Sequence, residues 1–131
     1  KKYPKLRIIG HSAAFWCEIS EGVCQEERNG YPKGKVKEGR LPKLMREYGN
    51  LYADLSAGSG SNAMMRDPEY AAKFIEEFSD RMFFGVDLCH PADTFSFDFD
   101  DFFKKMVDDK MLTPENYRKI MRDNAVRVLE L

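Results

Sequence analysis

Cysteine is scarce in this sequence, and its pattern excludes two common uses of the residue. The three cysteines match neither a zinc ribbon nor a CxxC motif in their spacing. Their odd number also argues against the disulfide framework of a small secreted domain. We therefore expect reduced thiols and a cytoplasmic protein.

Long apolar runs and blocks of like charge are also absent. A transmembrane helix needs about 20 consecutive apolar residues, and no run in this sequence approaches that length. The formal net charge is −1, and no cluster of basic residues indicates a surface for nucleic acid or anionic lipid. We expect no nucleic acid and no membrane among the partners.

What the sequence does contain is the composition of one globular domain. Of its 131 residues, 43% are apolar and 33% are charged, which is typical of a folded chain with a real core. The chain starts at a lysine, and residues 3–6 read as the exit from a helix into a strand. We expect residues 1–131 to be the C-terminal part of a longer protein.

Two stretches, residues 6–12 and 81–87, share one design. Each is an apolar run that ends in a glycine and is followed by an ionisable side chain, His11 in the first stretch and Asp87 in the second. Both read as buried strands, and ligands bind at the C-terminal ends of strands in parallel α/β folds. The pattern predicts that His11 and Asp87 face one shared pocket.

Strands and helices alternate along the chain. Apolar and turn-forming residues predict strands at 6–11, 51–56 and 82–87, a short helix or turn at 13–17, and helices at 41–48, 68–78, 99–109 and from 114 onward. This order indicates an α/β fold with right-handed crossovers and a parallel sheet. Three strands cannot close a barrel and leave two unpaired edges, which supports a missing portion that supplies further strands.

Residues 20–39 predict a long surface loop. Four glycines and a proline are interleaved there with charged residues. A loop of this length in a compact domain is usually functional, so we expect it to overhang the pocket. The alternative is a disordered insertion.

His11 and Asp87 are the leading candidates for chemistry. Histidine titrates near neutral pH, so His11 could act as a general acid or base or as a metal ligand. The alternative is a histidine hydrogen-bonded in the core. A carboxylate directly after an apolar strand is costly to bury unless it is paired or bound to metal. For Asp87 the alternatives are a helix N-cap and a salt bridge.

Three other residues have open assignments. His90, in the exit loop of the third strand, is a candidate for substrate contact or a solvent-facing histidine. Trp16 is a candidate wall of the pocket or a member of an aromatic cluster with Phe15 under the long loop. Asp54, on the predicted middle strand, points into a barrel interior or toward a neighbouring helix.

Four segments together resemble the C-terminal part of the amidohydrolase superfamily. The branch they resemble most includes aminocarboxymuconate-semialdehyde decarboxylase and related metal-dependent hydrolases. Residues 3–11 are similar to that branch's sixth barrel strand with its histidine, residues 50–56 to the seventh strand, and residues 80–87 to the eighth strand with its aspartate. Asn124 and Ala125 match the final helix.

This resemblance implies strands six to eight of a TIM (β/α)8 barrel and one divalent metal, usually zinc, with manganese as an alternative. Asp87 would be a metal ligand that also takes a proton from metal-bound water, and His11 would polarise the substrate or shuttle a proton. The implied activity is hydrolysis or non-oxidative decarboxylation of a small molecule that bears a carboxylate, amide or ester. From their positions in the sequence, Trp16 and His90 are the residues that we expect to contact this substrate.

The sequence also departs from the family. The His-x-His motif of the first strand and the histidine of the fifth are not in this chain, and Val86 stands where threonine is common. Zinc sites typically use three or more protein ligands, so we expect this segment alone to be inactive and to bind metal poorly. The competing hypothesis is a non-catalytic α/β binding module that forms a homo-oligomer through its open sheet edge and makes contacts with the 20–39 loop.

Overall fold

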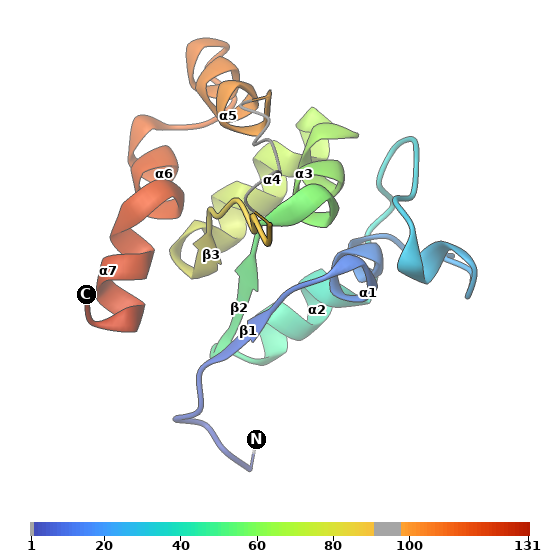
Figure 1. The fold of residues 1–131 in the computed structure, drawn as a ribbon, viewed down its shortest axis with the longest axis horizontal. Coiled ribbons are helices and arrows are strands. Elements are labelled where there is room, and N and C mark those ends of the chain that lie inside the picture. Colours follow the sequence, from blue (N-terminus) through green and yellow to red (C-terminus); the bar gives the residue numbers. More distant parts are fainter. Residues whose placement is uncertain (1, 91–97) are drawn as a thin grey trace.

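Three short strands form one parallel sheet in the described part of the chain. They are β1 (Ile8–Gly10), β2 (Leu51–Asp54) and β3 (Met82–Phe83), in the order β1-β2-β3. Each strand lies beside the next one along the sequence, with helices in the connections (Figure 1). The parallel sheet and the alternation of strands and helices agree with the sequence prediction.

The computed structural model describes residues 2–90 and 98–131. Its α-helices are α1 (Ala13–Trp16), α2 (Arg40–Glu47), α3 (Ala57–Met65), α4 (Pro68–Phe78), α5 (Asp98–Asp108), α6 (Pro114–Arg118) and α7 (Asn124–Leu129). Short 3-10 turns are η1 (Cys17–Ile19), η2 (Glu27–Asn29) and η3 (Ser79–Arg81), and a π turn, η4 (Lys119–Asp123), joins α6 to α7. Figure 1 shows α6 and α7 on one side of the sheet and α1 on the other. None of the described helices is both long and apolar enough to cross a bilayer.

Capping residues set where two of the helices begin. The Asp67 carboxylate accepts a hydrogen bond from the Tyr70 backbone N–H, and Thr113 Oγ1 accepts one from the Asn116 N–H. A proline follows each cap in the first turn, where its missing N–H costs nothing. Both starts agree with the sequence prediction.

One contiguous apolar cluster joins the sheet to the helices around it. One face of α4 lies in this cluster, with four buried residues at helical spacing: Ala71, Phe74, Ile75 and Phe78. The Phe74 and Phe78 rings lie 4.8 Å apart between centroids. Phe103 of α5 is fully buried in the same cluster. This packing fixes the sheet against its helices.

The structure corrects two predicted elements. The predicted strand at 82–87 pairs only over Met82–Phe83, because the Phe84 N–H donates to the Ile120 carbonyl oxygen (3.0 Å) rather than to a strand. Residues 57–62, for which the sequence predicted no helix, form the first turns of α3. Asp87 therefore lies four residues beyond the paired end of β3.

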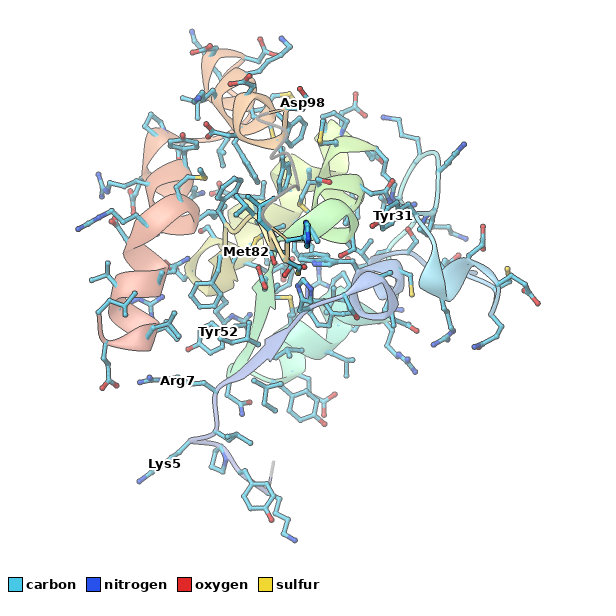
Figure 2. The ribbon with its side chains drawn as sticks, viewed as in Figure 1. Lys5, Arg7, Tyr31, Tyr52, Met82 and Asp98 are labelled. Atoms are coloured by element: carbon cyan, nitrogen blue, oxygen red, sulfur yellow. The ribbon has the colours of Figure 1, made fainter. Side chains whose placement is uncertain are left out.

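The prediction of a buried strand at residues 6–12 is wrong for the described structure, in which β1 is exposed and apolar. Ile8 and Ile9 remain 48% and 42% exposed, and Leu6 just before the strand is 55% exposed. Arg7, just before the strand, extends toward the end of α7 (Figure 2), where its Nη2 lies 3.1 Å from Glu130 Oε1. A strand edge with apolar side chains of this kind is a surface for pairing with another strand.

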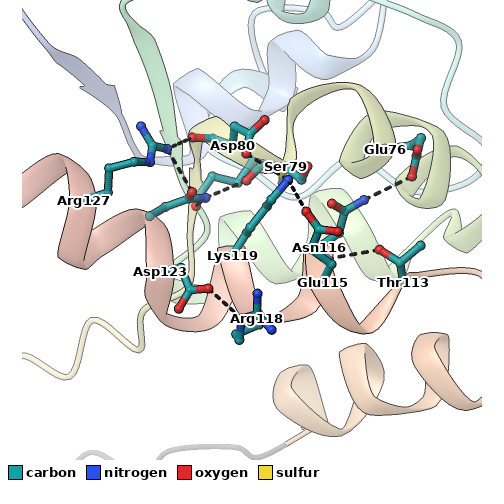
Figure 3. A network of polar contacts seen from close by, with 12 residues as sticks. Glu76, Ser79, Asp80, Thr113, Glu115, Asn116, Arg118, Lys119, Asp123 and Arg127 are labelled. Carbon is teal, nitrogen blue, oxygen red and sulfur yellow. Dashed lines mark hydrogen bonds and ion pairs between the residues drawn. The ribbon is translucent and has the colours of Figure 1, made fainter.

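A buried asparagine connects α7 to the start of β3. Asn124 is 1% exposed, and its Nδ2 donates to the carbonyl oxygens of Ser79 (2.6 Å) and Met82 (2.8 Å). Arg127 Nη2 donates both to Asn124 Oδ1 (3.0 Å) and to the Asp80 carbonyl oxygen (2.6 Å). Figure 3 shows the contacts among these residues and their neighbours. The amide thus satisfies two carbonyl groups at the entry to β3.

Asn124→Leu is expected to lower the free energy of unfolding by about 2–3 kcal/mol, since it leaves buried carbonyl oxygens without donors. Urea unfolding followed by circular dichroism measures the change. Asn50→Leu is the control, because the Asn50 amide also donates to two backbone carbonyls, at exposed positions. Water can replace it there, so a loss below about 1 kcal/mol is expected. Equal losses at both positions would contradict the role of burial.

Candidate functional site

Four polar side chains meet at the C-terminal end of the sheet. His11 Nδ1 lies 3.1 Å from Asp54 Oδ2, and His11 Nε2 lies 3.6 Å from Asp87 Oδ2. Ser56 Oγ donates to Asp54 Oδ2 (2.8 Å) and lies 3.3 Å from His11 Nδ1. The imidazole ring is therefore flanked by two carboxylates, one at the end of β2 and one in the segment that follows β3.

A tight turn directly after β1 positions His11. Ser12, the next residue, has a φ of 90°, which L side chains rarely adopt, and its carbonyl oxygen accepts from the Phe15 and Trp16 N–H groups of α1. Gly10 lies so close to Phe15 that a Cβ built on it would be 2.0 Å from the ring. The glycine lets α1 fold back against the strand end.

Asp54 ends the central strand and is held from several directions. Its Oδ1 accepts from the Ser56 backbone N–H (2.9 Å), and its backbone carbonyl oxygen accepts from Trp16 Nε1 (2.7 Å). The backbone of Asp54 also pairs with Phe83 in the parallel ladder. Its carboxylate is thus the best fixed of the two that face His11.

Asp87 reaches the site from the segment that follows β3. Its φ is 56°, in the left-handed region. A Cβ on Gly85 would lie 3.1 Å from Ser56 Cβ and 3.6 Å from Asp54 Oδ1, so glycine allows this segment to approach the end of β2. Cys89 Sγ donates to Asp87 Oδ1 at 3.6 Å.

The site is open to solvent in the described structure. The side chains of His11, Asp54 and Asp87 are 39%, 28% and 41% exposed. Over residues 2–90 and 98–131, no group of three or more His, Cys, Asp or Glu side chains has a geometry that could hold a metal ion. The cluster can hold and transfer a proton. It can also offer a carboxylate and an imidazole as two ligands for a metal ion.

A comparison with protein-family models places this geometry in context. The model described as Amidohydrolase matches residues 1–131. This chain belongs to the amidohydrolase family. Comparisons with curated proteins and with solved structures gave no match.

Family membership indicates the type of fold and the general class of activity. Amidohydrolases have a TIM-barrel fold, and the three parallel strands with their helices are consistent with part of such a barrel. Membership also supports an activity of the hydrolase or decarboxylase type. The superfamily resemblance read from the sequence is therefore confirmed.

Among the residues predicted from this amidohydrolase sequence, His11 and Asp87 lie side by side. Trp16 is 2% exposed and packs edge-on against Phe15, with ring centroids 5.3 Å apart, as in the aromatic-cluster alternative. His90 is exposed on the segment after Asp87. Contact of Trp16 and His90 with substrate stays a prediction, as do the chemical roles of His11 and Asp87.

Asp54 and Ser56 were not among the predicted site residues. The alternation along 51–56 is a usable signal, because Ala53 and Leu55 are fully buried while the polar side chains occur at alternate positions. Alternation alone could not decide whether Asp54 faced the site or a neighbouring helix. The contact with His11 decides it for the site.

The 20–39 loop of the amidohydrolase packs against α3 and the start of α4. A Cβ built on Gly58 of α3 would lie 2.8 Å from the Tyr31 hydroxyl oxygen, so the tyrosine is close to the helix backbone. Figure 2 shows this tyrosine beside α3. Lys35 Nζ and the Val36 N–H both contact the Asp67 carboxylate. Burial raises the pKa of the Asp67 carboxyl, but these hydrogen bonds outweigh it and lower that pKa below its ordinary value. A lid function of the loop stays a prediction.

Proposed function

We propose that this amidohydrolase is a metal-dependent hydrolase or non-oxidative decarboxylase in the branch that includes aminocarboxymuconate-semialdehyde decarboxylase. Its substrate would be a small molecule with a carboxylate, amide or ester group. The observation that carries the proposal is the pairing of His11 Nε2 with Asp87 Oδ2 at 3.6 Å, at the C-terminal end of a parallel sheet. This is the end of the sheet where TIM-barrel enzymes place their chemistry.

The donors available fit part of a metal site. Asp87 would hold a divalent metal, zinc in our proposal and manganese as the alternative, through its exposed carboxylate. Such a metal, when bound, lowers the pKa of its water to about 7. Zinc sites usually take three or more protein ligands, and the described residues do not form such a set. The chain would therefore supply only part of the active site.

The two side chains have separate tasks in this proposal. The Asp87 carboxylate accepts a proton from the attacking water. The His11 imidazole donates to, or takes a proton from, the substrate at Nε2, the nitrogen that faces Asp87. A protonated His11 would also attract a substrate carboxylate. His90 and Trp16 are proposed to shape the substrate side of this site.

The exposed sheet edges support a larger barrel. Ile8 and Ile9 are apolar and half-exposed on β1, although β-branched side chains of a barrel strand are normally covered. We propose that β1, β2 and β3 correspond to strands six, seven and eight, and that further strands of the barrel cover this edge. The remaining metal ligands would come from those strands.

Asp87→Asn tests the metal function directly in the intact protein. The neutral amide is a weaker ligand, so we expect loss of the bound metal and a fall in kcat/KM of at least about 100-fold, with the circular dichroism spectrum unchanged. Elemental analysis and hydrolysis of ester and amide substrates measure these changes. Asp109→Asn, the same change at an exposed position just after α5, is the control. Unchanged metal content and rate in Asp87→Asn would refute the proposal.

The β1 edge also favours a second candidate, a non-catalytic module that dimerises through this edge. Sedimentation of the purified protein separates the two. A stable homodimer that holds no metal, and that Ile9→Lys converts into monomers, would support the module. A species that holds one metal per chain, and whose association does not depend on Ile9, would support the enzyme.

A further inference from the structure

We propose that Asp54 is a positioning residue, which, together with Ser56, fixes the tautomer and the orientation of the His11 ring. The inference rests on the proposed function only for the role of His11 in proton transfer. It adds a residue outside the His11–Asp87 pair, on the central strand of the sheet. The structural part of the claim concerns which ring nitrogen carries the proton.

The contacts of Asp54 determine whether His11 Nδ1 carries a proton or a lone pair. An ionised carboxylate only accepts hydrogen bonds, and Asp54 Oδ2 lies 3.1 Å from Nδ1. A lone pair on Nδ1 would therefore face a negative oxygen. Nδ1 must carry a proton for this contact to be favourable.

Ser56 favours the same tautomer. Its hydroxyl proton goes to Asp54 Oδ2 (2.8 Å), so at 3.3 Å from His11 Nδ1 its oxygen is left with lone pairs to accept. Two acceptors, one charged and one neutral, thus surround the same ring nitrogen. In the neutral ring the proton lies on Nδ1, and Nε2 keeps its lone pair.

The consequence is a defined direction for the reactive nitrogen. Nε2 is on the side of Asp87, but its 3.6 Å separation from Asp87 Oδ2 is beyond hydrogen-bond distance. The two shorter contacts at Nδ1, 3.1 Å to Asp54 Oδ2 and 3.3 Å to Ser56 Oγ, therefore decide which nitrogen of the neutral ring carries the proton. A ring with a freely exchanging tautomer would present a lone pair at Nε2 for only part of the time. A fixed Nδ1–H makes Nε2 available to the substrate throughout, as second carboxylates do for histidines in other enzymes.

Asp54 is rigid enough for this task. Its backbone is in the central strand, its carbonyl oxygen accepts from the buried Trp16 indole, and its Oδ1 accepts from the Ser56 N–H. Only Oδ2 is directed at the imidazole. A group held by its backbone and by one oxygen can orient a partner through the other oxygen.

Asp54→Asn is the decisive variant. The amide can keep the hydrogen bond from the Ser56 N–H, but it places a donor instead of an acceptor against His11 Nδ1. Its Oδ1 can still accept from the Ser56 N–H, which places Nδ2 against His11 Nδ1. An amide NH2 is a donor, so it selects the ring with a bare Nδ1 and a proton on Nε2. We expect the tautomer to switch and kcat to fall about 10²–10³-fold, with KM changed less than about threefold.

The tautomer is measured by ¹⁵N NMR of the imidazole nitrogens in the intact protein, at a pH where the ring is neutral. The His11→Asn difference spectrum assigns the signals. Ser56→Ala keeps Asp54 Oδ2 at the ring and should retain the Nδ1 proton, with less than about a tenfold loss of kcat. Asp109→Asn should leave both the tautomer and kcat as in the wild type.

Each outcome decides between separate claims. A proton on Nε2 in the wild type would overturn the inference without any variant, as would an Asp54→Asn protein that keeps the proton on Nδ1. A tautomer that switches in Asp54→Asn supports the positioning role. If it switches while His11→Asn retains full activity, the positioning role holds and the proposed function of His11 fails.

Discussion

His11→Asn is expected to lower kcat/KM about 10²–10⁴-fold, the usual contribution of a positioned general acid or base. Asparagine can keep a hydrogen bond to Asp54 but cannot exchange a proton near neutral pH. The His11 side chain is 39% exposed, so its removal leaves no large cavity. We expect the free energy of unfolding to change by less than about 1 kcal/mol. Initial rates and urea unfolding of the same samples measure both effects.

Two further measurements separate the role of His11 from those of Asp87 and His90: the metal content of each variant and the kinetics of His90→Asn. His11→Asn should retain the bound metal, whereas Asp87→Asn should lose it, so elemental analysis separates the two roles. His90→Asn is the same substitution in the segment after Asp87 and should act mainly on KM. A kcat/KM of His11→Asn within threefold of the wild type would exclude this histidine from the chemistry.

Gly60→Ala is expected to lower the free energy of unfolding by about 3 kcal/mol, although alanine favours helix over glycine by about 1 kcal/mol. Gly60 is buried in α3, where the helix crosses the end of β2. A Cβ at this position would lie 2.1 Å from the Leu55 carbonyl oxygen and 2.4 Å from its carbon. Both are backbone atoms, so the helix has to move away from the strand. Chemical unfolding measures the loss.

Gly49→Ala is the matched control for Gly60→Ala. A Cβ on Gly49 would meet no atom within 4 Å, and its φ is outside the left-handed region. Stability should stay the same or rise by about 0.4–1 kcal/mol, because alanine restricts the unfolded chain. Since Leu55 lies between Asp54 and Ser56, Gly60→Ala should also disturb His11. A stability of Gly60→Ala equal to that of the wild type would show that α3 is not closely packed on β2.

Much of the fold could be predicted because its signals are local. Asp67-Pro68 and Thr113-Pro114 begin helices through contacts within one turn, and the spacing of Ala71, Phe74, Ile75 and Phe78 is that of one helical face. The prediction failed where distant segments compete for the same groups. The Phe84 N–H bonds to the C-terminal helix instead of extending β3, and nothing near Phe84 in the sequence signals that partner.

The same division holds for the site. His11 and Asp87 could be predicted because each follows an apolar run, and parallel strands present their ends at one edge. Asp54 and Ser56 could not be placed, since a polar residue on a strand can face either side with the same local pattern. Their contact with His11 depends on the register of β1 against β2, which pairs Gly10 with Ala53.

By itself, the amino-acid sequence determined the class of the fold, the parallel order of the strands, the superfamily and the two ionisable residues at the strand ends. The fold class and the strand order follow from periodicity and capping, and the two ionisable residues from their places next to apolar runs. The superfamily came from the resemblance of four segments to known family members. Only the tertiary structure decided which carboxylate holds the His11 ring and which one faces its other nitrogen. The physical reason is that hydrogen-bond partners are chosen by distances of about 3 Å between segments more than forty residues apart in the sequence. Strand register and helix packing set those distances.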